Sequence, residues 1–179
     1  MPDSEWILIS YHVPTNPSAV RVATWRALRQ QGAVPLGDGL YALPGSESNR
    51  TFVIELAERI NRGGGSAISF TAVPLEAEDE AAMRLKFEAA RYDEYRQVVK
   101  SAGKLVDHIE REEATEDFRL AEVDSLEEEL NKVRAQLGRT ISRDSVRYPA
   151  RDEAERAIDE AATRLQEYVT QAFQKENQE

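Results

Sequence analysis

Six basic residues gather between positions 132 and 151, although the second half of the chain is otherwise acidic. The only acid in this stretch is Asp144, so the segment carries a net charge of +5. Four arginines recur every four residues, which would stack them on one face of a continuous helix; they are Arg139, Arg143, Arg147 and Arg151. Because guanidinium groups offer paired donors to oxygens, this face could bind phosphate or another oxyanion. It could equally neutralise neighbouring Glu-rich helices, and Pro149 predicts that the helix breaks before Arg151.

A tryptophan flanked by two arginines forms a second group with binding chemistry. Trp25 lies four residues after Arg21 and four before Arg29, on a predicted helix and away from its apolar arc. One interpretation is that Trp25 docks against the second part of the chain while the arginines pair with acids there. The other is a nucleic-acid surface, because aromatic rings stack on bases and arginines contact phosphates.

No combination of residues predicts catalysis. The chain has no cysteine, which excludes thiol nucleophiles, disulfides and thiolate metal sites. Its two histidines leave little material for a zinc centre or a catalytic triad; we interpret His12 as a structural residue and His108 as solvated. The glycine run at 63–65 lacks the lysine and the spacing of a phosphate-binding loop. We therefore expect no enzyme, no metal site and no cofactor.

The composition is that of a globular, water-soluble chain. Of the 179 residues, 41% are hydrophobic and 31% are charged, and the formal net charge is −10. No apolar run approaches the roughly 20 residues that span a bilayer, so no membrane association is expected. The opening residues, MPDSE, carry acids where a secretory signal carries bases, which predicts a cytoplasmic location.

Charge and turn-forming residues both change near residue 75. The first 75 residues hold six basic and six acidic side chains, so the remainder holds 17 basic and 27 acidic ones. Seven of the nine glycines and six of the seven prolines lie in the first part. We therefore predict a turn-rich domain over residues 1–76 and a helical domain over residues 77–179.

The first domain has the order β-α-β-β-α-β, which is typical of a ferredoxin-like α+β fold. Predicted strands cover 6–11, 33–36, 40–43 and 67–73, and predicted helices cover 18–31 and 49–61. Asp38-Gly39 supplies the positive φ angle that a hairpin turn needs between the second and third strands.

The second domain shows three apolar stripes at helical spacing, which predict an antiparallel three-helix bundle. The stripes run over 83–109, 126–137 and 154–172. Arg91 interrupts the first of them. We interpret the acidic excess as the solvated outer faces of these helices.

Several of these segments together resemble the N-terminal region of the ChrB family of chromate-resistance regulators. They are the strand ending at Pro14-Thr15, the helix that runs from Arg21 into Trp25-Arg26-Ala27-Leu28, the hairpin DGLYALP at 38–44, the run FEAARYDEY at 87–95, the helix at 126–137 and Ser142-Arg143-Asp144. The resemblance covers nearly all of this chain but only the N-terminal region of the family's longer members. It implies a transcription regulator of a chromate-efflux operon that binds promoter DNA and is released by chromate.

The first domain is also similar to the ferredoxin-like domains of the phenylacetate regulator PaaX and of small CRISPR-associated nucleases. In the nucleases, this resemblance implies an aspartate after the first strand that binds metal. His12 stands at the matching place in this sequence. Nuclease activity is therefore not expected.

The leading hypothesis is a ChrB-like transcription-regulator module that binds DNA without catalysis and lacks the family's C-terminal domain. The expected phosphate or oxyanion contacts, chromate included, are Arg139, Arg143, Arg147, Arg151, Arg21 and Arg29, and Trp25 is the expected interdomain or partner contact. The alternative is a cytoplasmic protein-interaction or oligomerisation scaffold that recruits a partner or a second copy through its acidic face and Trp25. A remnant nuclease is a third reading.

Overall fold

The computed structural model describes residues 5–14, 18–116, 118–144 and 147–176. The chain divides into two compact units, Met1–Phe87 and Glu88–Glu179. Each unit is described by itself below. Within the described residues, no helix is long and apolar enough to cross a membrane.

The first unit is built on a four-stranded sheet in which every neighbouring pair is antiparallel. Its strands are β1 (Trp6–His12), β2 (Val34–Gly37), β3 (Leu40–Pro44) and β4 (Ser66–Ala72). They lie in the order β2-β3-β1-β4, with the first strand in the interior and the fourth at an edge. This order, with a helix after β1 and another after β3, is that of a ferredoxin-like unit and confirms the predicted fold class.

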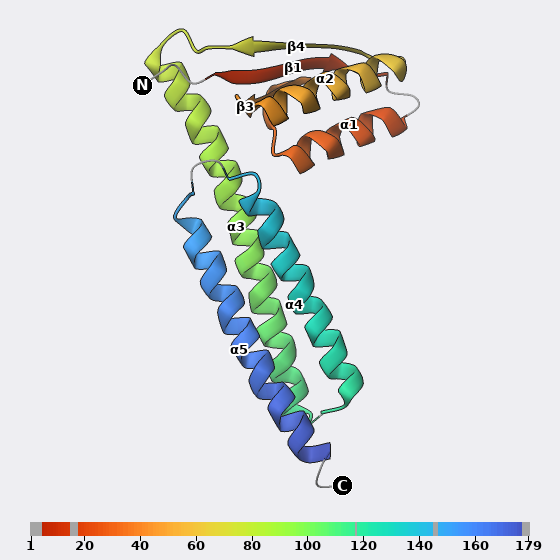
Figure 1. Cartoon of the computed structure of the whole chain (residues 1–179), viewed down its shortest axis with the longest axis vertical. Coiled ribbons are helices and arrows are strands. Elements are labelled where there is room, and N and C mark those ends of the chain that lie inside the picture. The colour runs from red at the N-terminus through yellow and green to blue at the C-terminus, as the bar shows by residue number, and fades with distance from the viewer. Residues whose placement is uncertain (1–4, 15–17, 117, 145–146, 177–179) are drawn as a thin grey trace. The chain divides into compact units, whose positions relative to one another are not determined.

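Two helices, α1 (Ser18–Gln31) and α2 (Glu47–Arg62), lie along one face of this sheet (Figure 1). The side chain of Ser46 accepts a hydrogen bond from the backbone N–H of Asn49 and thereby caps the start of α2. Apolar side chains of both helices meet those of the strands in one core cluster; its buried members are Ile7, Ile9, Val13, Leu28, Leu43, Val53, Leu56, Ala57 and Ile60.

The hairpin between β2 and β3 requires glycine at one position. Gly39 adopts a φ of +72°, and a Cβ built there would collide with the carbonyl oxygen of Tyr11. The carbonyl of Gly39 in turn accepts a hydrogen bond of 2.8 Å from the backbone N–H of Tyr11. The turn is therefore fastened to the end of β1, as the Asp38-Gly39 pair predicts for a tight hairpin.

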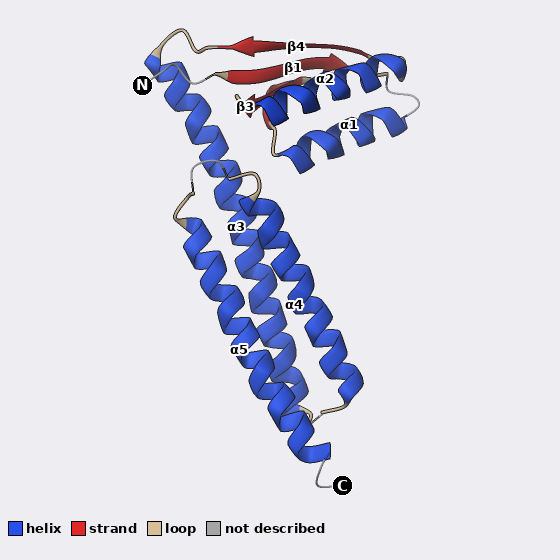
Figure 2. Cartoon of the chain, viewed as in Figure 1, coloured by secondary structure: helices blue, strands red, loops and turns tan. Residues whose placement is uncertain are grey.

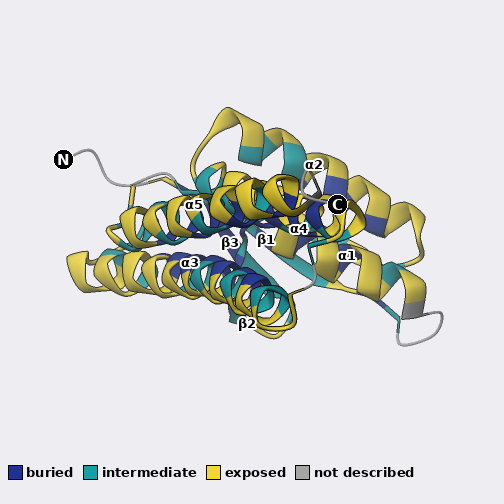
Figure 3. Ribbon diagram, turned by 90° about the horizontal axis from the view of Figure 1, so that it is seen from below, coloured by how far each residue is buried: buried dark blue, intermediate teal, exposed yellow. Residues whose placement is uncertain are grey.

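The second unit is a bundle of three antiparallel helices joined by short connections (Figure 2). The helices are α3 (Ala77–Ala114), α4 (Leu120–Ile141) and α5 (Ala150–Glu176), and the unit begins within the first of them. Buried residues recur along each helix and exposed residues cover the outer faces (Figure 3). The core contains Tyr95, Val98, Ala102, Leu105, Ile109, Val123, Leu126, Leu130, Val133, Ala154, Ile158, Ala161, Leu165, Tyr168 and Ala172, which include the buried members of the three predicted stripes except Phe87.

The first unit extends to Phe87, within α3. The helix begins at Ala77, as its sequence predicts, but its first three turns belong to the sheet unit. The ring of Phe87 lies 5.0 Å from that of Trp6 on β1. Both rings are buried.

Candidate nucleic-acid interface

Helix α1 carries three arginines and no acidic residue. Arg21, Arg26 and Arg29 are all exposed, and none forms an ion pair with a carboxylate of the described residues. The charge of this helix is therefore not cancelled locally, which distinguishes it from the other helices of a chain whose net charge is −10. A helix face of this kind attracts polyanions, because local rather than total charge governs association.

Trp25 projects from the same exposed side of α1. Its side chain is 45% exposed, and the guanidinium of Arg29 lies 5.3 Å from the centre of its ring. This cation–π contact holds an aromatic ring and a positive charge next to each other at the surface. The structure thus brings Trp25 and Arg29 together, as their spacing predicts, while docking of Trp25 against the second unit stays a prediction.

The expected arginine patch at residues 139–151 does not form one helical face. Helix α4 ends at Ile141 and α5 begins at Ala150. Residues four apart share a face only within a helix, so the spacing of these arginines does not align them. Arg139 lies in the last turn of α4, Arg143 and Arg147 lie in the connection, and Arg151 lies in the first turn of α5. A break before Arg151 is as predicted, but the helix already ends at Ile141, eight residues before Pro149.

Three of these four arginines are paired with carboxylates. Arg143 lies 2.6 Å from Glu94, Arg147 lies 3.0 Å from Asp152, and Arg151 lies 2.8 Å from Glu155. The hydrogen bond to Glu155 raises the pKa of Arg151. Arg139 is exposed and has no ion pair among the described residues. Of the two interpretations of the patch, neutralisation of neighbouring acids therefore fits its geometry better than phosphate binding.

Glu94 of α3 bridges two arginines inside the second unit. One of its carboxylate oxygens pairs with Arg143 and the other accepts a hydrogen bond of 2.8 Å from Arg91. Arg91 is only 4% exposed, and burial lowers its pKa while the Glu94 carboxylate opposes that shift. The interruption of the apolar stripe by Arg91 thus marks a buried charge with its counter-ion one turn away, a signal that the sequence contained.

Asp144 anchors the connection between α4 and α5 to the bundle core. Its carboxylate accepts a hydrogen bond of 2.6 Å from the hydroxyl of Tyr95, whose ring is fully buried. The same carboxylate accepts the backbone N–H groups of Arg147 and Tyr148 at 2.8 and 3.2 Å. Burial, followed by this hydrogen bond, raises the pKa of Tyr95. The acid that interrupts the basic segment therefore has a structural task.

The two histidines have different surroundings. His12 is exposed at the end of β1, where its Cα pairs with that of Ser66. His108 lies among acids and is half-buried rather than fully solvated: its side chain is 23% exposed and faces Glu112, Glu122 and Glu129. Two of these glutamates come from α4, which no spacing within α3 reveals.

Comparison with known proteins gives a consistent result. The family model described as "Protein ChrB, N-terminal" matches residues 21–179. Protein ChrB of Cupriavidus metallidurans (strain CH34) is 28% identical over 102 residues, which amount to 56% of this chain and 32% of that protein. The match therefore spans about a third of the length of this relative. No solved structure matches the chain. Because the family model covers both the sheet unit from α1 onward and the whole helical bundle, the chain belongs to the family of ChrB N-terminal regions.

Proposed function

We propose that this chain is the DNA-contacting module of a ChrB-type transcription regulator and that it catalyses no reaction. The single observation that carries the proposal is the outer face of α1, where Arg21, Trp25 and Arg29 are exposed and the arginines have no carboxylate partner among the described residues. Arginines of this kind contact phosphates, and the aromatic ring offers a stacking surface for an accessible base.

The arginines at 139–151 contribute less in this proposal. Arg143 and Arg151 must give up partly buried carboxylate partners before they bind a phosphate, which cancels much of the gain. The pair of Arg147 with Asp152 is exposed and costs little to open. Arg139 is the exception because it is exposed and has no ion pair in the described part of the chain. Arg139 is therefore a secondary phosphate contact, and Arg143 and Arg151 are expected to matter mainly for the bundle.

A fluorescence-anisotropy titration tests the proposal. It compares binding to the DNA upstream of the gene for this chain with binding to a duplex of scrambled sequence. The salt dependence is the informative quantity, because each phosphate contact contributes about 0.9 to the slope of log K against log salt. The double variant R21Q/R29Q is expected to weaken binding and to reduce this slope by about 2, and W25A is expected to weaken binding without changing the slope.

The matched control is R62Q/R84Q, which removes the same charge from the same unit. Arg62 and Arg84 each have a glutamate partner one helical turn away, at 4.0 and 2.7 Å. Equal salt slopes for both double variants would show that the arginines of α1 make no special contribution to DNA binding. Absence of binding by the unaltered chain at low salt would refute DNA binding altogether. A parallel titration with chromate asks whether these residues sense the oxyanion.

A scaffold function has one observation in its favour. Ile68 and Phe70 project from the edge strand β4 and are 67% and 45% exposed. Exposed apolar side chains on an unpaired edge strand are typical of a surface that pairs with another chain. Light scattering with and without DNA distinguishes the two functions, since a stable oligomer that ignores DNA favours the scaffold.

A further inference from the structure

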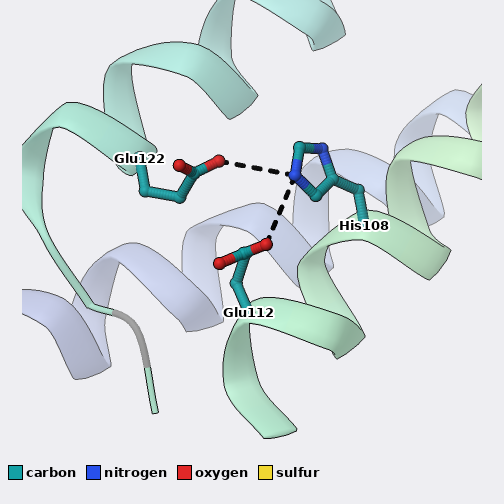
Figure 4. Close-up of side chains that lie close together, drawn as sticks. All are labelled: His108, Glu112 and Glu122. Carbon is teal, nitrogen blue, oxygen red and sulfur yellow. Dashed lines mark ion pairs between the residues drawn. The ribbon is translucent and has the colours of Figure 1, made fainter. Parts of the chain in front are cut away.

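His108 of α3 has a carboxylate near each of its ring nitrogens. Glu112, one turn later on α3, and Glu122, in the first turn of α4, both approach Nε2 (Figure 4), with oxygens at 3.5 and 3.4 Å. Glu129 of α4 approaches Nδ1 at 3.3 Å. The side chains of His108, Glu112 and Glu122 are only 20–23% exposed, so the group lies within the helix pair rather than on its solvated face.

With these contacts, a neutral imidazole has a carboxylate facing a nitrogen that has no proton to donate. A neutral ring donates from one nitrogen and presents a lone pair on the other. In either tautomer of a neutral His108, a lone pair therefore faces at least one carboxylate oxygen, which is repulsive unless a metal ion lies between them or the ring takes up a second proton. Among the described residues, no lysine or arginine pairs with Glu112, Glu122 or Glu129 to offset this negative charge.

The distances also favour a shared cation over direct hydrogen bonds. Separations of 3.4 and 3.5 Å exceed the roughly 2.7–3.2 Å of a good N–H···O bond. They match the edges of a coordination tetrahedron, because bonds of about 2.0–2.2 Å place neighbouring ligand atoms about 3.3–3.6 Å apart. The three candidate ligand atoms all lie within 4.8 Å of one another, so small side-chain rotations close the set.

We propose that His108 Nε2, Glu112 and Glu122 bind a divalent transition-metal ion of the zinc class. One imidazole and two carboxylates are a donor set that Zn²⁺ accepts, whereas Mg²⁺ and Ca²⁺ prefer oxygen ligands alone. Glu129, with an oxygen 3.3 Å from Nδ1, is the acceptor that favours the Nδ1–H tautomer and so leaves the lone pair of Nε2 for the ion. The surplus of carboxylates repels anions, so this site is separate from any phosphate or chromate contact.

The position of the site predicts what the ion does. Glu112 lies near the end of α3 and Glu122 near the start of α4, so a shared ion cross-links the two helices across their connection. A groove open to solvent is lined by His108 and Glu129, together with Lys104 and Arg111, and it does not include Glu112 or Glu122. Because the ion binds the folded bundle and not the unfolded chain, it raises the melting temperature of the second unit.

Isothermal titration of the full chain with ZnCl₂, in a non-coordinating buffer and without a histidine tag, tests the proposal. One ion is expected per chain with micromolar or tighter affinity, together with a rise in melting temperature by circular dichroism. The variants H108Q and E122Q are each expected to weaken binding at least tenfold and to abolish the thermal shift. MgCl₂ is expected to give neither effect.

Matched controls use residues outside the cluster. His12 is the chain's other histidine, and Glu128 is an exposed acid that pairs with Lys132 on α4. H12Q and E128Q are expected to bind Zn²⁺ like the unaltered chain. Absence of saturable binding, or binding that persists in both H108Q and E122Q, would overturn the site. The visible spectrum of Co²⁺ bound to the unaltered chain is a test that needs no variant. A spectrum typical of Co²⁺ coordinated by six oxygens would also overturn the proposed site.

Discussion

Replacing Glu94 by glutamine removes the charge that holds two arginines in the second unit. Its carboxylate receives Arg91 on one oxygen and Arg143 on the other, at 2.8 and 2.6 Å. Arg91 is 4% exposed, so it has little access to water as a substitute partner. Its Nε already lacks a hydrogen-bond partner among the described residues, which leaves Glu94 as its principal compensation.

The expected loss of unfolding free energy is about 2 kcal/mol. Removing one partner of a fully buried ion pair costs roughly 3–5 kcal/mol, and two features of Glu94 lower that figure. Its side chain is 27% exposed, so water partly replaces it, and glutamine retains one acceptor oxygen. For a unit of this size, a loss of about 2 kcal/mol corresponds to a fall in melting temperature of about 8–16 °C.

The assay is denaturant unfolding followed by two signals. Both tryptophans lie in the first unit, so their fluorescence reports that unit, and far-UV circular dichroism reports mainly the helices of the second. E94Q is expected to lower the dichroism midpoint and to leave the fluorescence midpoint unchanged. E128Q, an exposed glutamate in an ion pair with Lys132, is expected to cost about 0.5 kcal/mol or less. A loss for E94Q as small as that for E128Q would refute the reasoning.

Three further predictions concern single contacts. Y95F removes the donor to Asp144 and is expected to cost about 1.5–2 kcal/mol by circular dichroism, and D144N combined with it should cost less than the sum of the two. Burial raises the pKa of Tyr11 to about 12, so its contribution to the free energy of unfolding is complete below pH 10 and is lost as the pH rises from about 10 toward 12. The Y11F variant should show a smaller loss of stability over this pH range in urea unfolding followed by fluorescence. G39A is expected to destabilise the first unit by more than 2 kcal/mol because its Cβ meets a backbone carbonyl, whereas G64A, with positive φ but open space, should cost only about 1 kcal/mol in the same assay.

Most of the fold was readable from the sequence because its signals are local. The strand expected over 6–11 is β1 (Trp6–His12), and the helix expected over 18–31 is α1 with the same bounds. Alternation, helical periodicity and the Asp-Gly turn each act over a few residues, and here they agree with one another. The contact of Phe87 with Trp6 could not be predicted in this way, because the two residues are 81 positions apart in the sequence.

The candidate site was less readable because charge partners are often distant in sequence. Arg143 pairs with Glu94, 49 residues earlier, and Tyr95 reaches Asp144 across the same separation. Local spacing of four residues implied one surface, but the helix stops after Ile141. His108 shows the same effect, because Glu122 and Glu129 reach it from the next helix.

A count of basic residues therefore does not locate a binding surface until their intramolecular partners have been subtracted. The segment with the highest formal charge, 132–151, loses most of it to Glu94, Asp152 and Glu155. Helix α1 has half as many basic residues but has no acid of its own and no ion pair in the described residues, so its charge is available to a polyanion. Salt dependence measures that difference directly, because each phosphate that an unpaired arginine neutralises releases cations from the DNA, whereas a paired arginine leaves behind a carboxylate that takes up cations and lowers the net release. The slope lost in R21Q/R29Q compared with R143Q/R151Q consequently ranks the two surfaces, and a larger loss for the second pair would show that its ion pairs open on DNA.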